Sequence, residues 1–476
     1  MVYLRRPRAQ SYRIAETLIA VHGIMKFDNL EGMSVSDSDS KSMSRREMLG
    51  KMGQLAAGAA LTPVISRLGL AAPVEKARRP NILFIVVDDL GNGDLGCYGS
   101  TICDTPNIDG LAAQGARLTH FYVAAPLCAP TRVSFMTGKY PQRTSLAWNP
   151  SFKNPEDGLS PDETTIADVL KQAGYHTGLV GKWHLGYAPK FHPLKQGFME
   201  FYGFLSGWMD YYKHTYNEGT KWMFRNEDPI EEEGYSTELF TREAISYLDR
   251  RKDDGRPFFL YLAYNAPHWP DQAPEEWIKR SRHGVYGGMV GCMDDSIGKV
   301  IQHLDSLGLA DNTLVVFSSD NGGDGHGSNA PYSGGKENLQ EGGVRVPSIA
   351  RWPGKIPAGK VIEEPIISMD LFATCVAVAG AGLPRDLAVD GKDVLPVLKG
   401  EAKSPHKILF WQHKKQTAAR KGELKLLREE GKPDRLYNVV RDPGEKQDLS
   451  AEYPKTVKAL SAALDRWLAG LKKRAR

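Results

Sequence analysis

The sequence predicts an α/β protein in which a mostly parallel β-sheet is sandwiched by helices, with a smaller C-terminal α+β subdomain. Apolar runs of strand length recur along the chain, and helix-like segments separate them, which is the alternation of a doubly covered sheet. Polar clusters directly follow several of the runs, at the edge where open α/β sheets bind ligands.

The elements follow this alternation from residue 81 onward. The run Asn81–Val87 is continuously apolar, as in a strand buried on both faces. A helix is expected over residues 164–173, because a threonine precedes its apolar face and Gly174 follows it. Residues 105–115 and 288–307 predict further helices, and strands are expected over residues 176–180, 257–264 and 313–317.

The pattern changes beyond residue 376, where short strands over 408–411 and 424–428 precede a helix over 453–471. We therefore divide the chain into an N-terminal extension (1–72), a catalytic domain (80–375) and a C-terminal subdomain (376–476).

The N-terminal extension resembles an export signal. Residues 44–49 form a twin-arginine pattern, an alanine-rich apolar stretch follows over 55–65, and small residues stand at 69–72. We expect a bacterial, periplasmic protein that the Tat translocon exports after folding, with Met43 as an alternative start.

Composition excludes several classes of function. The formal charge of +4 resides entirely in residues 1–72, so the remaining chain is neutral and offers no basic field for nucleic acid. Mean hydropathy is −0.39, which predicts no stable membrane anchor. The five cysteines include no CxxC pair; Cys97 and Cys103 are expected as free thiols rather than a bridge.

Two acidic pairs predict a metal site. Asp88 and Asp89 directly follow the first strand, and Asp320 and Asn321 follow the strand ending at residue 317. A helix cap or a turn would explain either pair alone. Their common position after buried strands favours a site for a hard cation, Ca²⁺ or Mg²⁺.

The most specific segment surrounds Cys128. It reads C-x-P-x-R, with Pro130 and Arg132, and Thr137 and Gly138 follow after four residues. This pattern resembles the signature of type I sulfatases of the alkaline phosphatase superfamily, and a lone buried thiol would not require it. The resemblance extends over nearly all of residues 80–450, through the segments 88–91, 96–99, 105–109, 181–186, 266–268, 319–322, 334–336, 341–347, 436–438 and 442–443.

The resemblance implies that a formylglycine-generating enzyme oxidises Cys128 to an aldehyde, whose hydrate attacks sulfur, expels the alcohol and then releases sulfate. It implies that the modified Cys128 joins Asp88, Asp89, Asp320 and Asn321 as metal ligands.

The resemblance also assigns roles to five side chains that reach the same sheet edge. Arg132 would hold the aldehyde hydrate, and Lys182 and Lys336 would bind sulfate oxygens. His184 and His268 would share the acid–base roles, with His268 favoured as the acid and the assignment left open. Solvated lysines and a hydrogen-bonded core histidine are the structural alternatives.

The expected substrate is a sulfated small molecule or glycan, and Trp208, Tyr211, Tyr212 and Trp269 are candidate pocket walls. Three other functions stay open at this point: a phosphonate monoester or phosphodiester hydrolase on the same scaffold, a non-catalytic exported glycan-binding protein, and a membrane-anchored transferase.

Overall fold

The computed structural model describes residues 78–216, 219–385 and 387–474. The predicted signal segment and the boundary at residue 72 lie outside these ranges. Among the described residues, no helix combines the length and the apolar character needed to cross a membrane.

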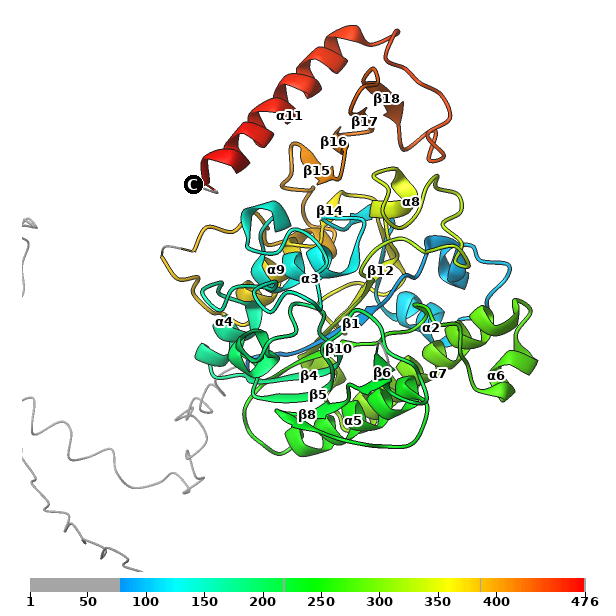
Figure 1. The fold of residues 1–476 in the computed structure, drawn as a ribbon, viewed down its shortest axis with the longest axis vertical. Helices are drawn as coiled ribbons and strands as arrows, with labels where there is room; N and C mark the ends of the chain where they lie inside the picture. Colours follow the sequence, from blue (N-terminus) through cyan, green and yellow to red (C-terminus); the bar gives the residue numbers. More distant parts are fainter. Residues whose placement is uncertain (1–77, 217–218, 386, 475–476) are drawn as a thin grey trace, which may run out of the picture. The chain divides into compact units, whose positions relative to one another are not determined.

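A ten-stranded sheet forms the centre of the fold (Figure 1). Its middle strands are parallel, and antiparallel pairings join β12 to both of its neighbours and β8 to both of its neighbours. The mostly parallel sheet is thus confirmed. The strand order is β13 (Lys360–Ile362), β2 (Ala116–Leu118), β12 (Ser348–Arg351), β11 (Thr313–Ser319), β1 (Asn81–Val87), β10 (Phe258–Ala263), β4 (His176–Lys182), β5 (Glu200–Phe204), β8 (Phe224–Arg225) and β9 (Asp228–Pro229).

Helices cover both faces of this sheet. Side chains alternate along a strand, so Ile82, Phe84 and Val86 of β1 enter one core while Leu83 and Ile85 enter the other. The first core is completed by α3 (Cys128–Thr137), α4 (Ile166–Gln172) and α9 (Asp370–Val378). The second is completed by α2 (Pro106–Gln114), α5 (Ser236–Arg251) and α7 (Gly284–Ser306), against which α6 (Glu275–Arg280) packs.

Several predicted elements match the structure closely. The first strand has the predicted bounds, because all seven of its residues are buried. The strand predicted to end at residue 180 continues to Lys182, which places this lysine on the sheet itself. Helix α4 begins two residues later than expected: the Thr165 side chain accepts from the Asp168 amide, and the Asp168 carboxylate accepts from the Thr165 amide.

The C-terminal part is a four-stranded antiparallel sheet with one long helix, as the fold prediction required (Figure 1). The strands are β15 (Leu409–His413), β16 (Gln416–Lys421), β17 (Leu424–Glu429) and β18 (Arg435–Asn438), and the helix is α11 (Pro454–Arg474). The smaller elements are β3 (Phe121–Tyr122), β14 (Ile366–Ile367), β6 (Thr215–Tyr216), β7 (Thr220–Lys221), α8 (Glu341–Val344) and α10 (Leu395–Leu398).

Candidate active site

Two neighbouring strands deliver the acidic pairs to one point. Strands β1 and β11 run parallel with Val87 opposite Ser319, so the residues that follow them emerge side by side. The Asp89 amide donates to Asp320 Oδ1 at 3.3 Å, and the Asp320 amide donates to the Val87 carbonyl at 3.1 Å. The parallel register therefore explains why two pairs more than 200 residues apart in sequence form one cluster.

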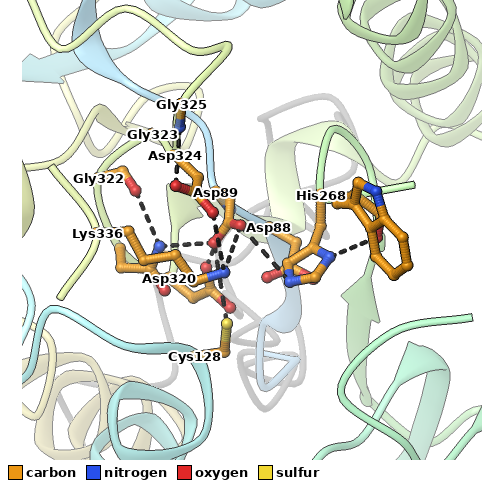
Figure 2. A network of polar contacts seen from close by, with 12 residues as sticks. Asp88, Asp89, Cys128, His268, Asp320, Gly322, Gly323, Asp324, Gly325 and Lys336 are labelled. Carbon is orange, nitrogen blue, oxygen red and sulfur yellow. Dashed lines mark hydrogen bonds and ion pairs between the residues drawn. The ribbon is translucent and has the colours of Figure 1, made fainter. Parts of the chain in front are cut away.

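The next strands in the sheet, β10 and β4, add basic groups to this cluster. Lys182, the last residue of β4, is fully buried and its Nζ lies 2.5 Å from Asp88 Oδ2. His268 follows β10, and its Nε2 lies 3.6 Å from Asp89 Oδ2 (Figure 2). A buried ammonium requires a counter-charge, which Asp88 provides.

Cys128 is the first residue of α3, a helix that the sequence pattern did not predict. Its buried Sγ lies 3.9 Å from Asp89 Oδ1 (Figure 2). Arg132 stands one turn later on the same helix face, and its Nε and Nη2 donate to Asp320 Oδ2 at 2.9 and 2.7 Å. The four-residue spacing of the motif is thus the spacing of one helical turn, and Gly138 ends the helix at φ 65°.

Lys336 approaches from the loop that follows β11. Its Nζ lies 2.6 Å from Asp89 Oδ2, and its side chain is 14% exposed, so it is not a solvated lysine. The loop packs tightly on itself: a Cβ at Gly322 would lie 1.7 Å from the Gly342 carbonyl oxygen. This close approach accounts for the glycines on both sides of the loop.

Two buried oxygens of the cluster have no hydrogen-bond partner. They are Asp88 Oδ1 and Asn321 Oδ1, whereas Asn321 Nδ2 donates to Asp89 Oδ1 at 2.7 Å. Asp88, Asp89, Cys128 and His268 each place one potential ligand atom within 4.8 Å of the others. Hard divalent cations bind carboxylate and amide oxygens, and buried oxygens without a hydrogen bond are free to bind one. The residues of this cluster therefore fit the Ca²⁺ or Mg²⁺ ion that the sequence predicts.

Electrostatics in the cluster follow from burial and from the neighbouring charges. Burial alone would raise the pKa of Asp88, but Lys182 and further cations hold that pKa well below its usual range. Burial raises the pKa of the Cys128 thiol, which keeps the unmodified sulfur protonated and a weak nucleophile. Burial also lowers the pKa of His184 strongly. Burial lowers the pKa of His268 as well, although the nearby Asp89 carboxylate acts to raise that pKa.

Backbone strain accompanies these contacts. Asp89 and His184 adopt φ angles of 63° and 62°, a region that non-glycine residues rarely occupy. His184 is buried, and its Nδ1 has no hydrogen-bond partner. No local sequence pattern predicts either conformation, because both depend on tertiary packing.

One predicted pocket wall is wrong. Tyr211 is fully buried, stacks on Tyr235 and places its hydroxyl 2.8 Å from the carbonyl oxygens of Asn265 and His268. It supports the loop that carries His268 instead of facing a substrate. Trp269 is 56% exposed beside this loop, in agreement with a wall position.

The remaining sequence predictions concern thiols and aromatics away from the cluster. Cys97 and Cys103 are free thiols in the structure, as expected. Tyr212 is exposed and lies against Tyr235, whereas Trp208 packs edge-on against Trp269 at 4.8 Å.

Comparison with known proteins decides the family. A family model described as Sulfatase matches residues 80–381, and one described as N-sulphoglucosamine sulphohydrolase, C-terminal, matches residues 335–473. The chain belongs to the sulfatase family. It is an enzyme of the sulfuric ester hydrolase class, which removes the non-catalytic alternative.

Curated sulfatases resemble this chain over most of both lengths. The N-acetylgalactosamine-6-sulfatase of Canis lupus familiaris is 37% identical over 394 residues, covering 78% of this chain and 75% of the relative. The steryl-sulfatase of Homo sapiens is 36% identical and covers 70% of this chain and 72% of the relative. Sulfate ester hydrolysis is therefore the activity of this family member.

Solved structures of other proteins share the fold. The crystal structure of Ps i-CgsB in complex with k-i-k-neocarrahexaose has a TM-score of 0.79 and 36% identity, covering 82% of this chain and 93% of that chain. The phosphonate monoester hydrolase of Agrobacterium radiobacter has a TM-score of 0.62 at 20% identity, covering 83% and 96%, which shows a common fold alone.

Proposed function

We propose that this sulfatase cleaves sulfate monoesters of carbohydrates with a nucleophile derived from Cys128, aided by a divalent metal. The observation that carries the proposal is the position of Cys128: its sulfur begins α3, 3.9 Å from Asp89, among carboxylates that directly follow two parallel strands. A reactive group at this position faces both the acidic cluster and the lysines around it.

Asp88, Asp89, Asp320 and Asn321 would hold the metal, with the modified Cys128 beside them, and Ca²⁺ or Mg²⁺ suits these oxygen donors. When bound, the cation neutralises sulfate charge and makes a neighbouring hydroxyl more acidic. The two partnerless oxygens, Asp88 Oδ1 and Asn321 Oδ1, support this assignment.

The modification would be made by a formylglycine-generating enzyme, and the aldehyde hydrate would supply the attacking hydroxyl and the internal route for sulfate release. Arg132 stands one helical turn after Cys128, and its guanidinium is held by Asp320. Arg132 is therefore positioned to orient the modified group. Lys182 and Lys336 would bind sulfate oxygens as point charges. Lys182 would then share its ammonium between Asp88 and the sulfate, and Lys336 would share its ammonium between Asp89 and the sulfate.

The two histidines differ in access, which favours His268 as the acid for the leaving oxygen. The His268 side chain is 13% exposed, and its Nδ1 lies 2.6 Å from the Trp269 carbonyl, which leaves Nε2 toward the cluster. His184 is buried beside Gly207 and would take the proton of the aldehyde hydrate. A leaving alcohol needs a proton from a group that the substrate can reach.

A carbohydrate substrate is supported by the relatives named above, one solved with a neocarrahexaose and another named for N-acetylgalactosamine, and by the exposed Trp269. We also propose periplasmic export through the Tat translocon, supported by the twin-arginine pattern at residues 44–49. Replacing both arginines by lysine and locating the protein by cell fractionation tests the export.

The test of the activity is sulfate release from a panel of sulfated saccharides and one aryl sulfate, with a phosphodiester alongside. The protein is co-expressed with a formylglycine-generating enzyme, and Cys128→Ala serves as the blank. We expect sulfate release from at least one ester and none from the blank. Turnover of the phosphodiester alone, or substantial activity in Cys128→Ala, would contradict the proposal.

A further inference from the structure

A cavity of about 210 Å³ adjoins the reaction cluster on the side of His268. Asp89 of the cluster lines this cavity. Pro267 and Trp269, the residues on either side of His268 in the chain, line it as well. Figure 2 shows Asp89, His268 and Asp324 in one network of polar contacts. A group that accepts a proton from His268 would therefore leave toward this cavity.

Two aromatic residues line the cavity, the buried Tyr286 and the exposed Trp269. The flat exposed wall is Trp269. Its indole is 56% exposed and is supported by Trp208, whose ring packs at 65° with centroids 4.8 Å apart. A large exposed aromatic side chain that a second ring holds in place offers a flat apolar surface for a sugar or aryl ring.

Two carboxylates, those of Asp271 and Asp324, make another part of the cavity wall acidic. Asp271 forms an ion pair with His326, and the Asp324 side chain is 67% exposed, 4.0 Å from Lys336 Nζ. Lys336 lies closer to Asp89, at 2.6 Å, so it does not neutralise Asp324 fully. Carboxylates accept hydrogen bonds from hydroxyl groups and repel a second anion.

Cationic side chains surround the position of the sulfate group, and carboxylates line the cavity beside it. Lys182, Arg132 and Lys336 gather at the cluster that would receive the sulfate group, whereas the cavity next to His268 is aromatic and acidic. The sulfate would therefore meet cationic side chains beside the proposed metal, whereas the remainder of the substrate would meet Asp271 and Asp324.

We propose that this cavity binds the ring that carries the sulfate ester, and that Asp271 and Asp324 select an uncharged ring over one with a second sulfate or a carboxylate. The proposal rests on the proposed function, because it takes His268 as the residue that faces the leaving oxygen. It assigns a neutral sulfated saccharide as the substrate class.

The experiment compares two aryl sulfates that differ in one charge, 4-(methoxycarbonyl)phenyl sulfate and 4-carboxyphenyl sulfate. The ratio of their kcat/KM values is measured for the wild-type protein, Asp324→Asn and Asp271→Asn, each co-expressed with a formylglycine-generating enzyme. Comparing this ratio between variants cancels the intrinsic reactivity of the esters. We expect the preference for the neutral ester to fall about three- to tenfold in each variant.

Asp253→Asn is the matched control, because Asp253 is exposed and precedes β10, whereas the reaction cluster follows that strand. Its ratio should equal that of the wild type. Sulfate release from both esters with the same ratio in every protein would overturn the cavity assignment and leave the proposed function standing. Release from neither ester, with sulfate released from a sulfated saccharide, would overturn the cavity assignment alone.

Discussion

Two buried clusters of opposite charges lie in this molecule, and they differ in the potential metal ligands that they bring together. The reaction cluster joins Asp88, Asp89 and Asp320 to Arg132, Lys182 and Lys336. Asp88 Oδ1 and Asn321 Oδ1 make no hydrogen bond, although Arg132 Nη2 lies 3.7 Å from Asp88 Oδ1. The interface cluster joins Glu341 of α8 to Lys425 of the C-terminal sheet, Arg345 and Glu445.

In the interface cluster each carboxylate faces a donor. Lys425 Nζ lies 2.8 Å from Glu341 Oε1 and 3.2 Å from Glu445 Oε1, and the Glu341 amide donates to Glu445 Oε2 at 2.7 Å. Despite burial, Lys425 and then Arg345 hold the pKa of Glu341 below its usual range. Glu445 Oε1 makes no hydrogen bond, but Lys425 Nζ lies 3.2 Å from it. The reaction cluster differs because Asp88, Asp89, Cys128 and His268 each place a potential ligand atom within 4.8 Å of the others, which indicates a site that takes up a cation.

The largest effect should come from breaking the reaction cluster. Asp320→Ala removes a proposed metal ligand and the partner of Arg132, so we expect kcat/KM to fall about a thousandfold or more, with loss of bound metal. Sulfate release and metal content by mass spectrometry measure both. Asp253→Asn again serves as the control, and full metal content in Asp320→Ala would refute the ligand assignment.

Breaking the interface cluster should affect stability rather than chemistry. Lys425→Met leaves Glu445 buried without its cation and leaves Glu341 with Arg345, which should lower the free energy of unfolding by about 3–5 kcal/mol. Chemical denaturation measures this loss. Lys421→Met, at an exposed position of the neighbouring strand, is the control. Equal stability of the two variants would show that the interface cluster does not stabilise the fold.

Metal binding should stabilise one cluster only. At about one hundred times its dissociation constant, Ca²⁺ or Mg²⁺ should raise the free energy of unfolding of the wild type by about 2.7 kcal/mol. Thermal unfolding with added ion or with chelator measures the shift. The shift should vanish in Asp320→Ala and persist in Lys425→Met; an equal shift in Asp320→Ala would place the ion elsewhere.

The smallest effect concerns the support of the His268 loop. Tyr211→Phe removes a hydrogen bond worth about 1 kcal/mol, and we expect kcat to fall about fivefold with metal content unchanged. Tyr264→Phe, which loses a buried contact with Thr241, should cost similar stability without the loss of kcat. An unchanged kcat in Tyr211→Phe would limit this tyrosine to a structural role.

The site residues that directly follow strands were predictable, because apolar runs in the sequence mark the buried strands. The run Asn81–Val87 fixed the position of Asp88 and Asp89, and the run before Asp320 did the same for the second pair. Their convergence required only the rule that parallel strands share a carboxyl edge.

Other parts depend on tertiary context. Helix α3 was missed because Pro130 and buried polar residues obscure its period, although its first residue is Cys128. Tyr211 resembles a pocket wall in sequence, and only the structure shows its hydroxyl against the loop of His268. The strained backbone of Asp89 and His184 has no local signal at all.

The most direct test of the central claim follows the chemical state of Cys128. Preparations with different degrees of modification are made by varying co-expression of the formylglycine-generating enzyme, and the tryptic peptide of residues 118–132 is quantified by mass spectrometry alongside sulfate release. The site described here predicts that turnover rises in proportion to the fraction of Cys128 converted to the aldehyde. Full turnover by protein whose Cys128 remains a thiol would contradict it.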